Sequence, residues 1–196
     1  MMLTKLEKGD EVNILAPASF IEDEAQFNVG LEILKTWGLK INKNNLINRK
    51  FGYFSANDKQ RLIELEKGQS SKLIIFAKGG WGSARLLEED PKWKPSWMLG
   101  FSDTSSLLIS KYANGHLGSI HGPMIKTLAK EPSWSLRRLK NLLFDGFVDD
   151  IAGSPLIGGI AKGDIIVSNL TIFSYLIGTN HLPDLKGKII VFEDIN

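Results

Sequence analysis

A single serine lies at a predicted corner between a buried strand and a helix. The apolar run 97–99 predicts a short strand that stops at Gly100, and the turn Phe101–Ser102–Asp103 precedes a helical pattern that continues to position 112. This is the geometry of a nucleophile elbow, where the hydroxyl stands clear and the following N–H groups face a developing oxyanion. The usual elbow ends in glycine, but this chain has Thr104 there. Asp103 and Thr104 supply acceptors at the helix start, and simple capping of the helix by Ser102 and Asp103 is the alternative explanation.

A glycine-rich turn, KGGWGS over residues 78–83, follows the strongest predicted strand, 72–77. Gly80 could present its N–H beside Ser102 as half of an oxyanion hole, because a residue without Cβ permits close approach. The turn could instead cradle a phosphate at a helix start, although neither standard nucleotide-binding glycine pattern is present. A turn that only needs positive φ explains it equally well.

A serine nucleophile needs a base, and the base needs an orienting acid. Glu193, at the end of a predicted strand, is the candidate acid, although a solvated carboxylate explains it as well. The spacing of the three histidines favours none as the base. We expect His116 in a surface turn, His121 in packing or hydrogen bonding, and His181 in an exposed loop. If a base exists within this chain, His121 is the first candidate.

Strand and helix patterns alternate along the chain, which predicts an α/β fold: a parallel sheet with helices on both faces. Ligand sites in such sheets lie beyond the carboxyl ends of the strands, so the two special turns can face one crevice. The predicted strands are 12–16, 39–41, 72–77, 97–99, 119–121, 164–167 and 188–192, and the predicted helices are 24–37, 55–67, 84–89, 133–144 and 169–177.

Several side chains have predicted places in these elements. Ser55 is expected to cap the second helix, and Trp134 is expected to face inward from the helix 133–144. Trp81, Trp93 and Trp97 surround the two special turns. They could line a pocket there, although burial in the core is the commoner arrangement.

The local composition of the sequence changes after residue 145, and Gly, Asp and Pro are frequent up to residue 163. We predict an amino-terminal α/β domain over 1–148, then a linker and the start of a smaller carboxyl-terminal α/β domain over 149–196. The sequence ends directly after a strand pattern and the acidic pair Glu193–Asp194. We therefore expect the second domain to be incomplete.

The composition of the 196 residues, with 43% hydrophobic and 23% charged residues, is that of an ordinary globular protein. A net charge of +2 gives no indication of nucleic-acid or membrane partners. The absence of cysteine excludes disulfides, thiolate catalysis and zinc–thiolate sites, and three scattered histidines disfavour a metal site. We see neither a signal-peptide pattern nor an apolar run approaching the roughly 20 residues that span a bilayer.

Seven short motifs, in this order, resemble those of the LD-carboxypeptidases, the serine peptidase family that includes the microcin-immunity peptidases. The resemblance covers the whole chain and about the first two thirds of a family member. The motifs are LAPAS (15–19), FGYFSANDKQR (51–61), KGGWGSARLL (78–87), GFSD (100–103), HGPM (121–124), SNLT (168–171) and FED (192–194).

The resemblance implies Ser102 as nucleophile, the N–H groups of Gly80 and Asp103 as the oxyanion hole, and Glu193 as the acid that orients a histidine. It implies a cytoplasmic enzyme, commonly a homodimer, that uses no metal or other cofactor. Family members remove a terminal D-amino acid from small muropeptides at an L,D-peptide bond, and the microcin-immunity branch cleaves peptidyl-adenylate-like toxins. The family histidine follows the glutamate, in a segment that this sequence lacks. We therefore expect a base supplied from outside this chain, and impaired catalysis without it.

Two other functions remain open at this point. A non-catalytic muropeptide-binding or subunit module would use the same cleft without turnover. A nucleotide-binding α/β domain would use the glycine turn at residues 79–83.

Overall fold

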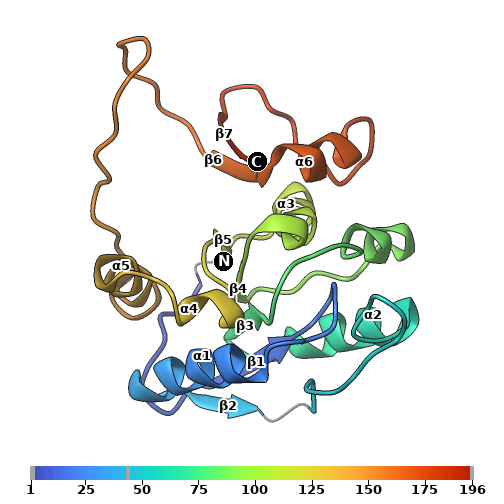
Figure 1. Cartoon of the computed structure of the whole chain (residues 1–196). Coiled ribbons are helices and arrows are strands. Elements are labelled where there is room, and N and C mark those ends of the chain that lie inside the picture. Colours follow the sequence, from blue (N-terminus) through green and yellow to red (C-terminus); the bar gives the residue numbers. More distant parts are fainter. Residues whose placement is uncertain (1–2, 43–44, 195–196) are drawn as a thin grey trace.

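A five-stranded, fully parallel sheet forms the centre of the molecule (Figure 1). The computed structural model describes residues 3–42 and 45–194. The strand order is β2-β1-β3-β4-β5, which confirms the predicted α/β class. The strands are β1 Glu11–Leu15, β2 Lys40–Asn42, β3 Leu73–Phe76, β4 Trp97–Gly100 and β5 Ser119–His121.

Helices cover both faces of this sheet, as the continuous apolar run of β3 predicted. Leu73 and Ile75 pack into a core with the helices α1, α4 and α5, whereas Ile74 and Phe76 pack with α2, the 3-10 helix η1 and α3. The helices are α1 Glu24–Thr36, α2 Asp58–Gly68, η1 Ala84–Glu89, α3 Ser105–Ala113, α4 Ile125–Leu128 and α5 Ser133–Asp145.

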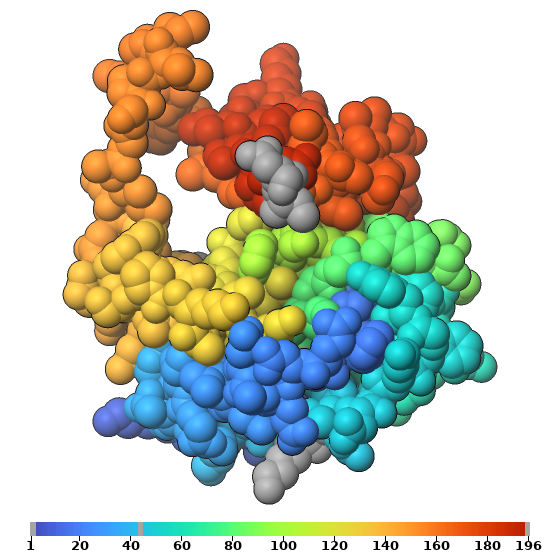
Figure 2. Space-filling model, in the orientation of Figure 1, coloured from blue at the N-terminus to red at the C-terminus, as the bar shows by residue number. Residues whose placement is uncertain are grey.

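A smaller unit lies over α3 (Figure 1). It contains β6 Ile165–Asn169, α6 Leu170–Leu176 and β7 Ile189–Glu193, and β6 pairs with β7 in parallel. Ile166 and Phe173 join the core on the α3 side of the main sheet. The segment 147–163, which connects α5 to this unit, stands off the rest of the surface (Figure 2) and is exposed at every position. No helix in the described ranges 3–42 and 45–194 is both long and apolar enough to cross a membrane.

The predicted placements of Ser55 and Trp134 in their helices were wrong. Asn57, not Ser55, caps α2 by accepting from the Gln60 N–H, while the Ser55 hydroxyl donates to the Ala16 carbonyl at 2.5 Å. A serine hydroxyl can form a hydrogen bond with a distant loop as readily as with its own helix, and the sequence alone does not show which bond forms. Trp134, expected inside, is 53% exposed because it lies in the first turn of α5, whose buried residues are Leu139 and Leu143.

Three loops meet at the carboxyl edge of the main sheet. They follow β1, β3 and β4, and they carry Ser19, the glycine turn 79–83 and Ser102. From β1 the chain adds β2 on one side and then β3 on the other, so the order in which strands are added reverses between β1 and β3. Open α/β sheets form their ligand crevice beyond the carboxyl ends of the strands at such a point.

Candidate active site

Ser102 occupies the predicted corner between β4 and the helix that follows. Its φ angle of 58° is in the left-handed region, which a non-glycine residue adopts only where the surroundings enforce it. A short 3-10 turn, η2 Ser102–Thr104, leads directly into α3. Gly100 is required at the entry, because a Cβ there would lie 2.5 Å from both the Phe76 ring and the Thr104 hydroxyl. The backbone at Ser102 is therefore an elbow, as the sequence predicted.

The glycine turn lies directly against this serine. A Cβ built on Gly79 would lie 3.1 Å from the Cβ and from the Oγ of Ser102, so only a glycine allows this approach without a shift. Gly80 has a φ of 114°, and a Cβ there would meet the Ser19 hydroxyl at 2.5 Å and the Tyr53 hydroxyl at 2.9 Å. The structure thus brings Ser102 and the Gly79–Gly80 segment together.

Asp103 fastens the two turns to each other. Its carboxylate accepts the Gly82 N–H at 3.2 Å and the Ser83 N–H at 2.9 Å, and its carbonyl accepts the Ser83 hydroxyl at 2.7 Å. Burial raises the pKa of this carboxyl, and the bonds from Ser83 and Gly82 oppose that shift only in part. The expected capping role was wrong: the carboxylate reaches across to the glycine turn, and the Thr104 hydroxyl donates to the Phe101 carbonyl.

A buried arginine on α2 also holds the glycine turn, and sequence reasoning did not assign it this role. Arg61 is 1% exposed; its Nη1 donates to the carbonyls of Pro17 and Gly82, the latter at 3.0 Å. Its Nη2 pairs with Asp58, and the guanidinium lies 4.5 Å from the centroid of the Phe54 ring. The sequence did contain an indication of this role: Arg61 lies on the same face of α2 as the buried Leu65, and charged side chains are seldom buried unless they are paired.

Glu193 lies at the end of β7, in the smaller unit. The register pairs it with Asn169, whose side-chain amide donates to the Glu193 carbonyl at 3.4 Å and to the Asp194 carboxylate at 3.2 Å. The β6 strand that carries Asn169 lies close to the turn that carries Ser102. The Oε1 atom of Glu193 is buried and has no hydrogen-bond partner among the residues that the structure describes. One oxygen of this half-buried carboxylate is therefore shielded from solvent, which the fully solvated alternative did not expect.

None of the three histidines forms a hydrogen bond with Ser102 or Glu193 within the described ranges 3–42 and 45–194. His121 lies 3.5 Å from the Ser105 hydroxyl through Nδ1 and bonds the backbone of Val167, and burial lowers its pKa to about 4. His181, expected to be exposed, is 9% exposed and lies 2.9 Å from the Ser110 hydroxyl. That expectation was wrong because the loop after α6 folds back onto α3.

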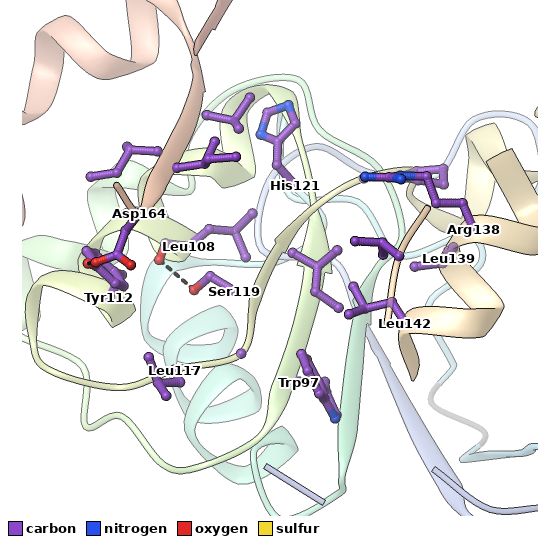
Figure 3. Close-up of a pocket in the computed structure, with 18 of the residues that line it drawn as sticks. Trp97, Leu108, Tyr112, Leu117, Ser119, His121, Arg138, Leu139, Leu142 and Asp164 are labelled. Carbon is purple, nitrogen blue, oxygen red and sulfur yellow. Dashed lines mark hydrogen bonds between the residues drawn. The ribbon is translucent and has the colours of Figure 1, made fainter. Parts of the chain in front are cut away.

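A cavity lined by residues of the main sheet and of the smaller unit lies away from Ser102 (Figure 3). It has a volume of about 630 Å³ and lies between β5, α5 and β6, so neither Ser102 nor Glu193 lines it. Trp97 lines this cavity, Trp93 is buried in the core, and Trp81, within the glycine turn, is 46% exposed. The three tryptophans therefore do not form one pocket around Ser102. Nor do the described residues contain a cluster of His, Asp or Glu side chains that could hold a metal ion.

Comparison with known proteins decides the family. Residues 12–122 match the LD-carboxypeptidase N-terminal domain, Peptidase_S66, which is more than half of the chain. The chain belongs to the LD-carboxypeptidase family. The matched segment of this family member runs from β1 to the end of β5 and contains the glycine turn and the elbow.

Two relatives extend the similarity beyond that domain. A Synechocystis sp. protein, provisionally named a carboxypeptidase, is 34% identical over 97% of this chain and 65% of its own length. A Bacillus subtilis protein, provisionally named a murein peptide carboxypeptidase, is 27% identical over 97% of this chain and 64% of its own length. The LD-carboxypeptidase family member described here thus spans somewhat less than two thirds of these relatives.

Solved structures support the same fold. The MccF-like protein of Bacillus anthracis aligns with a TM-score of 0.84 and 21% identity over 99% of this chain and 70% of its own. The muramoyltetrapeptide carboxypeptidase of Oxalobacter formigenes aligns with a TM-score of 0.76 and 22% identity over 95% of this chain and 66% of its own. The first alignment, which covers 99% of this chain, extends into the smaller β6–β7 unit.

Proposed function

We propose that this chain carries the nucleophile half of a serine carboxypeptidase of the LD-carboxypeptidase type. Its substrate would be a muropeptide, cleaved at the L,D-peptide bond before a terminal D-amino acid. The observation that carries the proposal is the left-handed backbone of Ser102, pressed against Gly79 at the carboxyl edge of the sheet. The names of the Bacillus and Oxalobacter proteins, which refer to murein peptide and muramoyltetrapeptide carboxypeptidases, support the substrate class.

In the proposed reaction, the Ser102 hydroxyl attacks the carbonyl carbon of the L-residue and gives its proton to a base. The N–H groups of Gly80 and Asp103 stabilise the oxyanion of the tetrahedral intermediate. The intermediate expels the D-amino acid, whose nitrogen takes the proton from the base, and an ester remains on Ser102. Water then hydrolyses that ester, with the same base taking and returning a proton.

Glu193 would orient the histidine that acts as this base. Its buried Oε1, which lacks a partner among the described residues, is suited to accept an imidazole N–H. We infer that this histidine comes from outside the chain, as in the family order Ser, Glu, His. We also propose residues 1–148 as the domain of the nucleophile and 149–196 as the linker and the beginning of the domain that carries the acid.

The test is release of D-alanine from a muropeptide tetrapeptide by the parent chain and by its Ser102→Ala and His121→Gln variants. We expect at most the residual ~10³–10⁴-fold acceleration over water that survives loss of a triad member, and still less from Ser102→Ala. Undiminished release by Ser102→Ala would sink the assignment of the nucleophile. Rapid release by the parent that His121→Gln abolishes would show that the base lies within this chain.

A second function, binding of muropeptides without turnover, is favoured by the same unpartnered Glu193 oxygen. It predicts that the tetrapeptide binds the parent and Ser102→Ala with equal affinity and that neither hydrolyses it. Adding a separate carboxyl-terminal segment that carries the histidine distinguishes the two functions, because only the enzyme would then release D-alanine.

A further inference from the structure

The Gly79–Gly80 peptide is held by a buried serine in the loop after β1. The Ser19 hydroxyl donates to the Gly79 carbonyl at 2.6 Å, and Ser19 is 1% exposed. Because this peptide is trans and planar, its C=O and N–H point in opposite directions. A hydrogen bond that fixes the carbonyl therefore also fixes the direction of the Gly80 N–H.

The two serines lie on different residues of this peptide. The Ser102 hydroxyl lies 3.1 Å from where a Cβ on Gly79 would be, and the Ser19 hydroxyl lies 2.5 Å from where a Cβ on Gly80 would be. The other polar groups that grip the turn, Asp103 and Arg61, bond further along it, at residues 82 and 83. Among the hydrogen bonds of the described residues, the one from Ser19 is thus the side-chain bond that orients this particular peptide.

We propose that Ser19 is a positioning residue that aims the Gly80 N–H at the oxyanion formed on the carbonyl that Ser102 attacks. The proposal rests on the proposed function, because it takes the Gly80 N–H as an oxyanion donor. A peptide between two glycines rotates at little steric cost, since neither residue has a Cβ. Rotation by half a turn would present the Gly79 carbonyl to the oxyanion, so a donor would be replaced by a repelling acceptor.

The role predicts an effect on a tetrahedral anion rather than on folding. The probe is γ-D-glutamyl-L-borolysine, in which boron replaces the carbonyl carbon of the L-residue. A bond forms between Ser102 Oγ and boron, the hydroxyl proton passes to the buffer, and boron becomes tetrahedral and anionic. No atom is oxidised or reduced. Boron NMR detects this adduct in the chain as it stands, without needing turnover.

We expect Ser19→Ala to weaken adduct formation by about 10- to 100-fold, somewhat less than the loss of a whole oxyanion donor. Ser19→Thr, which keeps the hydroxyl, should stay within about 3-fold of the parent. The matched control is Ser119→Ala, which also removes a hydroxyl that donates to a backbone carbonyl, that of Leu108 at 2.8 Å, away from the glycine turn. An affinity of Ser19→Ala within 3-fold of the parent overturns the proposal.

Two further measurements separate this proposal from the function on which it rests. An adduct that persists in Ser102→Ala, or no adduct in the parent, overturns the proposed function, and only the orienting effect of Ser19 on the Gly80 N–H is then left to test. In that case the backbone amide resonance of Gly80 decides. A changed chemical shift and faster hydrogen exchange in Ser19→Ala, but not in Ser119→Ala, support the positioning role, and an unchanged resonance overturns it.

Discussion

The two parts of the candidate site differ in how completely their polar groups are bonded. On the main sheet, the glycine turn is bonded at Gly79 by Ser19, at Gly82 by Arg61 and at Ser83 by Asp103. In the smaller unit, the buried Oε1 of Glu193 has no partner among the described residues. The first part is held by side chains from the main-sheet part of the chain, whereas the second retains a buried acceptor that a donor could satisfy.

This difference has an energetic meaning. Donors that are already oriented need no reorganisation when negative charge develops, which makes a pre-assembled oxyanion site effective. An unpartnered buried carboxylate oxygen carries a desolvation cost of about 1–3 kcal/mol until a donor reaches it. The donors of the glycine turn are therefore already oriented before any ligand binds. The Oε1 atom of Glu193 in the smaller unit, in contrast, is buried without a hydrogen bond from the described residues.

The largest effect is expected from Gly82→Ala. Gly82 has a φ of 107°, and a Cβ there would overlap the Phe54 ring. Backbone strain and overpacking together should lower the free energy of unfolding by about 3–4 kcal/mol. Urea denaturation followed by far-UV circular dichroism measures the loss.

The matched control for this prediction is Gly158→Ala in the exposed linker. Nothing lies within 4 Å of a Cβ at Gly158, and its φ is not in the left-handed region. We expect a change within about 0.5 kcal/mol. Equal losses for the two variants would contradict the contrast between a packed turn and an unpacked linker.

A smaller loss is expected from Asp103→Ala. This change leaves the buried N–H groups of Gly82 and Ser83 without an acceptor, so the free energy of unfolding should fall by about 2–3 kcal/mol. The comparison is Asp164→Ala in the smaller unit, where a carboxylate that is mostly exposed pairs with Lys188 at 2.6 Å. Exposed pairs contribute about 0–1 kcal/mol, so thermal and urea unfolding should rank the two variants clearly. A greater loss from Asp164→Ala would reverse the comparison.

The backbone of the site was predictable from the sequence because it follows from periodicity and glycine placement. The apolar run ending at Gly100 and the run 72–77 located both turns, and parallel strands place such turns at one edge of the sheet. The left-handed φ of Ser102 confirmed the elbow itself.

The partners of the polar side chains were not predictable in the same way. Ser55 and Asp103 looked like helix caps, yet each bonds a backbone group far away in sequence. A hydroxyl or carboxylate can satisfy a nearby N–H or a distant one, and local sequence does not show which distant backbone groups need a partner. The burial of Arg61 and His181 was missed for the same reason, since it depends on tertiary contacts.

An intermediate effect should appear at acid pH, at the junction of the two units. His121 bonds the backbone of Val167 in β6, and burial lowers the pKa of its ring from 6.5 to about 4. A depressed folded-state pKa gives stability that is present above the unfolded value and is lost as the pH falls through the folded value. Between pH 6.5 and 4, the free energy of unfolding should fall by roughly 2–3 kcal/mol from this group.

The control for the acid effect is His121→Gln, which cannot titrate in this range. Carboxylates with lowered pKa, such as Asp10 and Asp58, contribute to acid sensitivity in both proteins. The difference between the two stability curves, measured by urea titration at each pH, therefore isolates His121. Parallel curves from pH 6.5 to 4 would show that its ring is not desolvated.

The smallest effect is expected from the linker itself. Leu156 and Ile160 have 104% and 103% exposure, so folding removes no apolar area of these side chains from water. Their joint replacement by serine should change the free energy of unfolding by less than about 0.5 kcal/mol, whereas truncation of a buried side chain such as Ile166 typically costs 2–5 kcal/mol. A loss above 1 kcal/mol from the double serine variant would mean that the linker packs against the protein in solution. The smaller unit would then be held to the main sheet by contacts of the linker as well as by its packing on α3, and the two parts of the site would differ less than the structure indicates.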